Sequence, residues 1–493
     1  MRRRGVAGII VVGVVAVAVA ALAWGSDATR EPASAATGGA AARPNVVFVL
    51  TDDLSWNLVK YMPNVQRLRR RGLTFNRYVV TDSLCCPSRS SIFTGRFPHN
   101  TGVFTNGGND GGYQFFRNRG WEGQTFGAAL QPLGYRTAMM GKYLNGYLPR
   151  NGVPPGWTTW NGAGNGYGEF NYNLNENGRI VHYGRTPSDY LTDVVAAKGS
   201  AFIDAAATAR QPFALEIATF APHGPATPAP RDASLFPGAR VPRGGAFDRA
   251  NVKPPKWLGP RAPLTAGQIA SLDALYRKRL QSIQAVDDLV GRLQSTLRAR
   301  GLLDNTYIVF SSDNGFHMGE HRLLQGKMTG FDTDIRVPLI VAGPGVPHGA
   351  ANGRLVQNTD LHPTFAQLAG GTPAPGVDGR SLVPLLKGKR VAKWRSAALI
   401  EHHGPDTNGA DPDMPVPGSG NPTSYEAIRL ANAVYVEYRG GDREYYRIDR
   451  DPNERVNVYS KLSRKDRARL SARVAALAKC QGGASCWKAG RPR

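Results

Sequence analysis

The sequence predicts an α/β protein in two parts: a large layered domain with a mixed, mostly parallel central sheet flanked by helices, and a smaller C-terminal α+β subdomain with an antiparallel sheet. Its length of 493 residues is enough for one large core with an appendage. Short β-rich runs alternate with amphipathic helical stretches from residue 44 to about 386, as in a largely parallel sheet. Near the C-terminus, two β-rich runs flank Gly440 and Gly441, which indicates the antiparallel sheet.

The clearest strands are short runs rich in β-branched and aromatic residues, at 45–50, 135–140, 213–220, 307–311 and 339–342. The best helix runs from Thr265 to about Arg300, because apolar residues from Ile269 to Leu297 recur there at helical spacing. Gly301 can end this helix. The helix leads directly into the strand at 307–311.

Three stretches dense in Gly, Pro and polar residues, 106–119, 151–168 and 221–263, are expected to be irregular and to form walls of a functional site. After a linker at about 388–393, residues 427–438 and 444–448 are predicted to be antiparallel strands around Gly440 and Gly441. A terminal helix is expected from about 464 to 479. The predicted boundaries are 44–390 for the large domain and 391–493 for the C-terminal subdomain.

The N-terminus has the pattern of an export signal. Arg2, Arg3 and Arg4 form a basic segment, residues 5–22 are almost wholly apolar, and Ala21 and Ala23 frame a small-x-small cleavage site. Residues 1–23 are therefore predicted to be a signal peptide, with an uncleaved membrane anchor as the alternative, because the apolar run is nearly long enough to span a bilayer. Either interpretation places the rest of the chain outside the cytoplasm, secreted or membrane-anchored, after a flexible Ala/Gly-rich linker at 24–43.

The chain is strongly basic. Its formal net charge is +24, and about +21 remains without the three arginines of the signal. Basic residues gather at 67–71 and 464–493, but no aromatic-interleaved motif accompanies them, so no nucleic-acid partner is expected. The charge fits either a polyanionic partner or a solvated basic surface.

The four cysteines fall into two pairs. Cys480 and Cys486 flank a short Gly-containing loop and, in an exported chain, are predicted to form a disulfide. Cys85 and Cys86 are adjacent, which strains any bond between them, and too few other cysteines exist for a metal cage. The adjacent pair therefore calls for a chemical explanation.

Polar residues follow two predicted buried strands. Asp52 and Asp53 come after the first strand, and Asp313 and Asn314 come after the strand at 307–311. Parallel strands present their carboxyl ends to a ligand crevice, and an oxygen-only set of ligands suits Ca²⁺ or Mg²⁺ better than zinc. Asp and Asn also cap helices and fill turns, so these pairs alone are weak signals.

A longer motif surrounds the adjacent cysteines: Cys85-Cys86-Pro87-Ser88-Arg89, followed by Thr94-Gly95. Pro87 suits the first turn of a helix and Gly95 can end it, which places Cys85 at a helix N-terminus, where an anion is favoured. The pattern Cys-x-Pro-Ser-Arg with the following Thr-Gly resembles the signature of the sulfatase family within the alkaline phosphatase superfamily. Segments 141–145 (GKYLN), 221–225 (APHGP), 313–317 (DNGFH) and 334–338 (DIRVP) look like the N-acetylglucosamine-6-sulfatases and their extracellular heparan 6-O-endosulfatase relatives.

This resemblance implies a set of roles. A formylglycine-generating enzyme would oxidise Cys85 to formylglycine during maturation, and the aldehyde hydrate would be the nucleophile. Arg89 would hold the nucleophilic hydroxyl, and Lys142, His223 and Lys327 would contact the sulfate or the leaving oxygen. The metal, Ca²⁺ or alternatively Mg²⁺, would be bound by Asp52, Asp53, Cys85 as formylglycine, Asp313 and Asn314.

The implied reaction is hydrolysis of a sulfate monoester, with a sulfated carbohydrate or another sulfate ester as the partner. A metal with Lys142 and Lys327 would stabilise charge on the sulfate oxygens. His223 would protonate the leaving alcohol, and Lys327 is the second choice for this acid. Leu144 stands where many arylsulfatases carry His, which favours 6-O-sulfated N-acetylglucosamine. The alternatives are an arylsulfatase, or a phosphodiesterase or phosphonate hydrolase of the same superfamily; a non-catalytic polyanion-binding protein is disfavoured by the complete motif set.

Overall fold

A mixed sheet forms the centre of the computed structural model, which describes residues 43–491. Within that range its strands are β1 Asn45–Thr51, β2 Leu73–Val79, β3 Arg136–Lys142, β4 Thr159–Ala163, β5 Tyr172–Glu176, β6 Arg179–Tyr183, β7 Phe213–Ala218, β8 Thr306–Ser312, β11 Leu339–Ala342 and β12 Ala350–Gln357. Their order is β12-β2-β11-β8-β1-β7-β3-β4-β5-β6. The strands β8, β1, β7, β3 and β4 pair in parallel, so the carboxyl ends of five neighbours meet at one edge.

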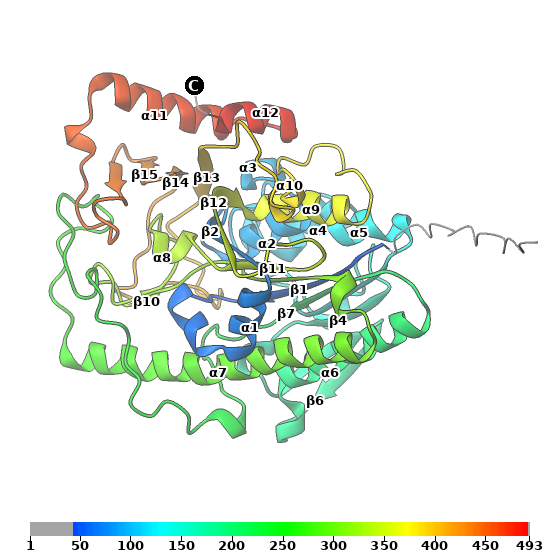
Figure 1. Ribbon diagram of the computed structural model, residues 1–493. Coiled ribbons are helices and arrows are strands. Elements are labelled where there is room, and N and C mark those ends of the chain that lie inside the picture. Colours follow the sequence, from blue (N-terminus) through cyan, green and yellow to red (C-terminus); the bar gives the residue numbers. More distant parts are fainter. Residues whose placement is uncertain (1–42, 492–493) are drawn as a thin grey trace, which may run out of the picture. The chain divides into compact units, whose positions relative to one another are not determined.

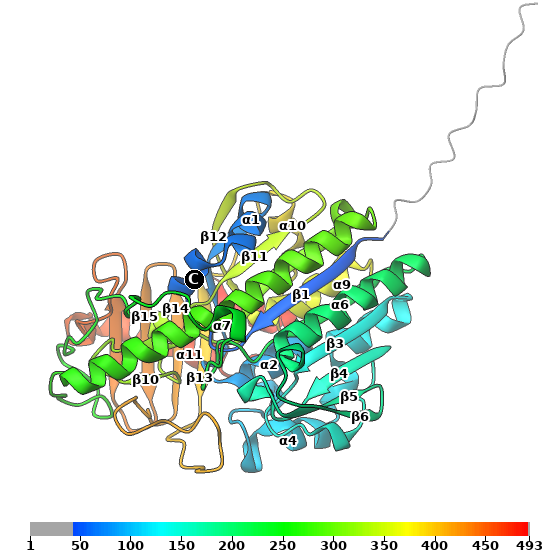
Figure 2. The ribbon, with the colours of Figure 1, turned by 90° about the horizontal axis from the view of Figure 1, so that it is seen from below.

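Helices cover both faces of this sheet (Figure 1). They are α1 Pro63–Arg71, α2 Cys85–Thr94, α3 Pro98–Thr101, α4 Gly112–Asn118, α5 Phe126–Leu130, α6 Leu191–Thr208, α7 Ala266–Ala299, α8 Asp332–Ile335, α9 Leu361–Leu368 and α10 Val383–Leu386. Figure 2 shows α6 and α7 lying across one face. The fold class predicted from the sequence is confirmed.

The alternation of side chains along β1 explains the two layers. Phe48 and its neighbours on the same side pack with residues of α2, α5 and α9 in one apolar cluster. Val47 and Val49 point the other way, into a second cluster with α6 and α7. Because β1 is apolar on both faces, it can only be a central strand buried from both sides.

Helix α7 begins as its sequence predicts. Thr265 caps it, accepting from the backbone N–H of Gln268, while the Gln268 side chain accepts from the Thr265 N–H. Its buried residues from Leu272 to Leu297 follow the predicted apolar spacing.

The C-terminal part holds a smaller antiparallel sheet in the order β13-β14-β15-β16. Its elements are β13 Ala397–His402, β14 Tyr425–Leu430, β15 Ala433–Tyr438, β16 Arg443–Arg447, α11 Arg464–Leu477 and α12 Gly482–Gly490. One face packs against α11, and the other joins the main core. Cys480 and Cys486 form the predicted disulfide.

Several local expectations are wrong. The stretch 106–119 contains α4, because Tyr113 and Phe116 bury themselves in the main core. The stretch 151–168 contains β4, which pairs with β3. The single strand expected at 427–438 is two strands, β14 and β15, that turn back at residues 431–432. Strands β2, β5, β6 and β12 and helix α6 were not anticipated.

The predicted signal peptide or anchor, 1–23, and residues 24–42 of the predicted linker lie outside the described residues. Within residues 43–491, no helix is both long and apolar enough to cross a bilayer. The predicted domain boundary at residue 390 falls between α10 and β13 and stays a prediction.

Candidate active site

The carboxyl edge of the parallel strands carries most of the predicted site. Asp52 and Asp53 follow β1, Asp313 and Asn314 follow β8, and Lys142 is the last residue of β3. All five side chains are buried. Because β8, β1, β7 and β3 are neighbours in the sheet, residues that are far apart in sequence lie at one place.

Two backbone features shape this edge. Gly141 has φ +94, and a Cβ there would lie 2.0 Å from the carbonyl oxygen of Ala218, so only glycine allows β3 to approach β7 just before Lys142. Asp53 has φ +64, in the left-handed region that Asp tolerates better than most residues. This conformation turns Asp53 toward Asn314, whose amide donates to the Asp53 carboxylate over 2.6 Å.

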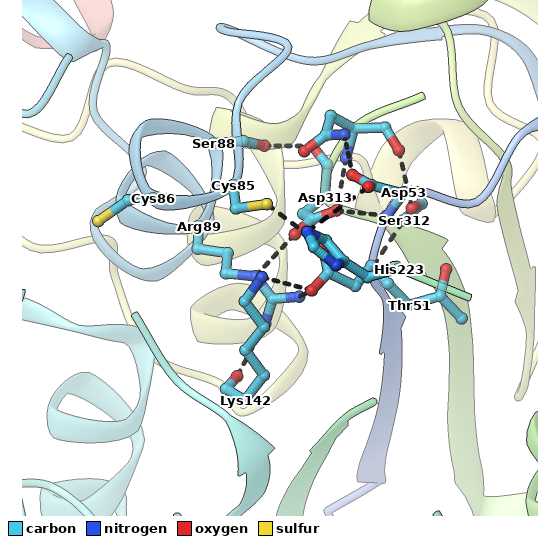
Figure 3. A network of polar contacts seen from close by, with 12 residues as sticks. Thr51, Asp53, Cys85, Cys86, Ser88, Arg89, Lys142, His223, Ser312 and Asp313 are labelled. Carbon is cyan, nitrogen blue, oxygen red and sulfur yellow. Dashed lines mark hydrogen bonds and ion pairs between the residues drawn. The ribbon is translucent and has the colours of Figure 1, made fainter. Parts of the chain in front are cut away.

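Cys85 is the first residue of α2, as expected from Pro87 and Gly95. Its thiol donates to Asp52 Oδ1 over 3.2 Å and accepts from Lys327 Nζ over 2.8 Å. Figure 3 shows the Cys85 sulfur pointing into the polar network and the Cys86 sulfur pointing away from it. Burial, followed by the charges of Asp413 and Asp52, raises the pKa of the Cys85 thiol.

A group of oxygen ligands lies beside Cys85. Asp52, Asp53, Cys85 and Asp313 each offer an atom within 4.8 Å of the others. Among the described residues, Asn314 Oδ1 is buried without a hydrogen-bond partner, although a buried amide oxygen normally has one. A cation would pair this oxygen and offset the carboxylate charges, so these residues fit a hard divalent ion.

Arg89 is fully buried and holds this group together. Its Nε donates to Asp313 Oδ2 over 2.7 Å, and its Nη1 donates to the Lys142 carbonyl over 2.7 Å. The resemblance implies that Arg89 holds the nucleophilic hydroxyl of residue 85. In the described chain it hydrogen-bonds to Asp313 and Lys142 and not to Cys85.

Three cationic side chains face the same point. Lys142 pairs with Asp52, Lys327 Nζ lies 2.8 Å from Asp53 Oδ1, and His223 Nε2 lies 3.8 Å from Asp53 Oδ2. Burial alone lowers the pKa of each group, but nearby carboxylates outweigh it and raise the pKa above its ordinary value. The carboxylate with the largest effect is Asp52 for Lys142 and Asp413 for the other two.

The His223 ring is oriented by its own loop. Nδ1 lies 2.7 Å from the Gly224 carbonyl, which can only accept, so Nδ1 carries a proton. Nε2 is thereby directed into the site. A protonated His223 can donate from this atom to an oxygen bound there.

Sequence reasoning missed two residues of the site. Arg279, on α7, donates to the carbonyls of Asp53 and Pro222. Its signal was present, because an arginine between Tyr276 and Ile283 falls on the apolar stripe of the helix. Asp413 Oδ1 lies 2.5 Å from His223 Nε2 and 2.7 Å from Lys327 Nζ. Nothing marks Asp413 in a Pro- and Gly-rich segment more than 300 residues from Cys85.

Two family models match the chain. The model described as Sulfatase covers residues 44–371, and the model described as N-sulphoglucosamine sulphohydrolase, C-terminal, covers 319–479.

Similar proteins include three with informative names. An N-acetylglucosamine-6-sulfatase of Homo sapiens is 35% identical, over 89% of this chain and 85% of its own length. An arylsulfatase of Volvox carteri is 33% identical, over 90% of this chain and 76% of its own length. A protein of Caenorhabditis elegans named as an extracellular sulfatase Sulf-1 homolog is 38% identical over 72% of this chain, which spans only 52% of that relative.

Solved structures share the fold. One is the structure of a protein in complex with its substrate, D-glucosamine-2-N,6-O-disulfate. It superposes on this chain with a TM-score of 0.74 at 24% identity, over 88% of this chain and 97% of the other protein's chain. A phosphonate monoester hydrolase of Agrobacterium radiobacter superposes with a TM-score of 0.68 at 21% identity, over 88% and 96% of the two chains. At these identities the likeness concerns the fold alone.

Proposed function

The chain belongs to the sulfatase family and is a sulfuric ester hydrolase, and from this premise we propose that it removes 6-O-sulfate from N-acetylglucosamine units of glycans. The observation that carries the site assignment is the convergence of Lys142, His223 and Lys327 on the buried surroundings of Cys85. The human relative supports the choice of sugar, because it is 35% identical over most of both chains.

Family membership implies a divalent metal and a formylglycine. We propose Ca²⁺, with Mg²⁺ as the second choice, held by Asp52, Asp53, Asp313, Asn314 and residue 85. When bound, the ion supplies positive charge for the sulfate oxygens. The formylglycine-generating enzyme would oxidise Cys85 to an aldehyde, and addition of water to this aldehyde would give a hydrate with two hydroxyls, one to attack sulfur and one to expel sulfate afterwards.

The cationic side chains have separate tasks in this proposal. Lys142 and Lys327 bind the sulfate oxygens, where charge accumulates as the ester bond breaks. His223 gives its Nε2 proton to the departing sugar oxygen, since its Nδ1 proton is held by the Gly224 carbonyl. Arg89 holds the nucleophilic hydroxyl of residue 85 in this proposal, and its bond to Asp313 adds the task of positioning a metal ligand.

We also propose that the protein is secreted. Two relatives are named extracellular sulfatases, and the predicted signal peptide agrees with export. Retention by an uncleaved anchor is the alternative for residues 1–23, and N-terminal sequencing of the exported protein distinguishes the two.

Arylsulfatase activity is the second candidate, because the Volvox relative is 33% identical over 90% of the chain. Phosphonate or phosphodiester hydrolysis has weaker support, from a shared fold at 21% identity.

The first prediction concerns the substrate. Purified protein carrying formylglycine should release sulfate from N-acetylglucosamine-6-sulfate faster than from the 3-O-sulfated isomer, because GKYLN at 141–145 and Leu144 follow the glucosamine side of the family. Sulfate release from a panel of sulfated sugars, aryl sulfates and phosphonate monoesters measures this preference. Turnover of aryl sulfates alone would contradict the proposed sugar, and turnover of phosphonates alone would contradict the sulfatase role.

A further inference from the structure

A loop between β13 and β14 closes over the site. It comprises residues 404–424, and we call it the 404–424 loop. Its base is tied by paired hydrogen bonds between Gly404 and Ser424 and by Asn421 with the backbone of Asp406. Its tip, at residues 411–413, reaches into the cluster around Cys85.

The tip inserts a carboxylate among the groups that the proposed mechanism assigns to sulfate. Besides His223 and Lys327, Asp413 accepts from Asn106 Nδ2 over 2.7 Å and from Asn145 Nδ2 over 3.4 Å. Its Oδ2 lies 3.4 Å from Cys85 Sγ. The Asp413 side chain is only 2% exposed.

Such surroundings are those of a bound oxyanion. Several donors from separate elements converge on one acceptor group that carries negative charge, as they would on a sulfate. A reacting sulfur must come within about 3.5 Å of the attacking atom, and this space is filled by the Asp413 carboxylate. Asp413 in this position and a reacting sulfate ester therefore exclude each other.

The same loop divides the space beside the site. On one side lies a cavity of about 320 Å³, lined by Lys142, Asn145 and Tyr167 and by residues 408–412 in part. On the other lies a cavity of about 300 Å³, lined by His223, Lys327 and Arg279 and by Pro412–Val416. Pro412 borders both cavities, so withdrawal of the tip would join them into one cleft.

The tip is held mainly by polar contacts. Met414 and Val416, next to the tip, are 40% and 42% exposed, so this part of the loop buries little apolar surface that withdrawal of the tip would have to expose. A competing anion can replace the contacts of Asp413, because it offers the same cations and amides an equivalent acceptor.

We propose that Asp413 is an internal competitor of the substrate's sulfate group, and that the 404–424 loop must swing outward to admit a sulfate ester. This inference rests on the proposed role of Lys142, His223 and Lys327 in binding sulfate. The structure then represents a closed form. A closed form populated about nine times in ten would raise the measured Kd of an anion about tenfold above its intrinsic value.

The test compares Asp413→Ala with Asp411→Asn in the full-length, metal-loaded protein. Asp411 is the matched control, because it lies on the same tip and accepts from Asn106 and from the backbone N–H of Asp413, but does not reach the lysines or His223. Its change to Asn removes the charge and keeps a side-chain oxygen that can accept these bonds. Calorimetric titration with inorganic sulfate gives Kd, and steady-state kinetics on the best ester of the panel gives KM and kcat. Asp413→Ala should lower Kd and KM about three- to tenfold, with kcat nearly unchanged, whereas Asp411→Asn should alter them less than about twofold.

Hydrogen exchange of the unaltered protein provides a measurement that does not depend on the variant's folding. Saturating inorganic sulfate should speed exchange in the peptide 404–424, because it displaces the tip. Slower exchange would mean that the loop closes over the anion, which overturns the proposal. So would a higher KM or a lost kcat in a folded Asp413→Ala, since Asp413 would then bind substrate or take part in the reaction.

The two proposals fail in different ways. If neither the unaltered protein nor Asp413→Ala binds sulfate or hydrolyses any sulfate ester, the proposed function is wrong, and the inference is wrong with it. If the unaltered protein is an active sulfatase whose Kd and KM are equal to or lower than those of Asp413→Ala, only the role of Asp413 is wrong.

Discussion

Neighbouring residues of one helix can have different roles, one in chemistry and one in packing. Successive side chains of an α-helix point about 100° apart, so Cys85 faces the charged cluster while Cys86 faces the apolar core. Both thiols are buried, and neither is disulfide-bonded in the described chain. Only Cys85 touches groups that could take part in a reaction.

The contrast between these residues is testable by substitution. Cys85→Ala should abolish turnover, because no nucleophile remains, while Cys86→Ala should cost at most about 1–2 kcal/mol of stability and keep kcat. Rates of sulfate release and urea unfolding measure the two effects. Cys85→Ser is the sharper control: a serine can be sulfated once but has no second hydroxyl to expel the sulfate, so mass spectrometry should detect a trapped ester. An inactive Cys86→Ala beside a fully active Cys85→Ala would refute the assignment.

Glu216, on β7, is a second informative residue. It lies opposite Phe48 and Met139 in the sheet, and within residues 43–491 neither carboxylate oxygen has a hydrogen-bond partner. Burial raises the pKa of Glu216 to about 8, against a smaller opposing effect of Arg89. The folded protein therefore favours the protonated acid.

This shift predicts a pH-dependent stability. The contribution of Glu216 to the free energy of unfolding is complete below its unfolded pKa of 4.5 and is lost as the pH rises through its folded pKa of about 8. Glu216→Gln should match the unaltered protein near about pH 4 and be more stable near about pH 9, by roughly 1.4 kcal/mol for each pH unit between the unfolded and the folded pKa of Glu216. Urea unfolding at both pH values measures the difference. A pH-independent difference would show that Glu216 is ionised or solvated in the folded state.

At the scale of whole elements, α7 supports the site by holding the segments that carry site residues. Its Arg279 lies on the buried stripe, packs over the Phe316 ring and donates to the carbonyls of Asp53 and Pro222. The helix thereby fixes the end of β1 relative to the loop that carries His223. Burial lowers the pKa of Arg279 to about 10, although Asp53 opposes this, so the guanidinium stays charged at neutral pH.

The helix-borne contact yields a prediction about metal affinity. Arg279→Lys keeps the charge but cannot reach both carbonyls with a planar fork, so Asp53 should be less well positioned. Loss of such a supporting contact typically weakens metal binding about 10- to 100-fold. Calcium titration calorimetry measures this affinity, with the exposed neighbour Lys278→Ala as the control. Equal affinities in a folded Arg279→Lys would contradict the supporting role.

At the scale of the whole molecule, metal, charge and stability are linked. The site gathers Asp52, Asp53, Asp313 and Asp413 out of solvent, and such carboxylates repel one another unless cations neutralise them. Lys142, Lys327 and Arg89 supply part of the positive charge. A bound divalent ion would supply more.

Removing the metal should therefore destabilise the protein as well as inactivate it. A ligand at about 100 times its Kd stabilises the folded state by about 2.7 kcal/mol, so chelation should lower Tm and added Ca²⁺ should restore it. Differential scanning calorimetry and sulfate release measure the two effects. Asp313→Ala should fold but lose both activity and the Ca²⁺-dependent rise in Tm. Full turnover after complete chelation would rule out the metal assignment.

Features that depend on short stretches of chain could be predicted from the sequence. The apolar run of β1, the spacing of α7 and the Pro and Gly at the ends of α2 act through contacts within a few residues. The disulfide between Cys480 and Cys486 closes a short loop and is local for the same reason. Asp52, Asp53, Asp313 and Asn314 directly follow strands, whose carboxyl ends parallel pairing brings to one edge.

Only the tertiary structure decided which distant segments meet. α4 and β4 form in stretches rich in glycine and polar residues, because contacts with the core and with β3 outweigh weak local preference. Asp413 has no local signal, yet it reaches Cys85 across 328 residues. Local patterns determine where helices and strands begin and end, because backbone hydrogen bonds and side-chain periodicity act over a few residues. The closed site depends on burial and charge pairing between segments that only the folded chain brings together.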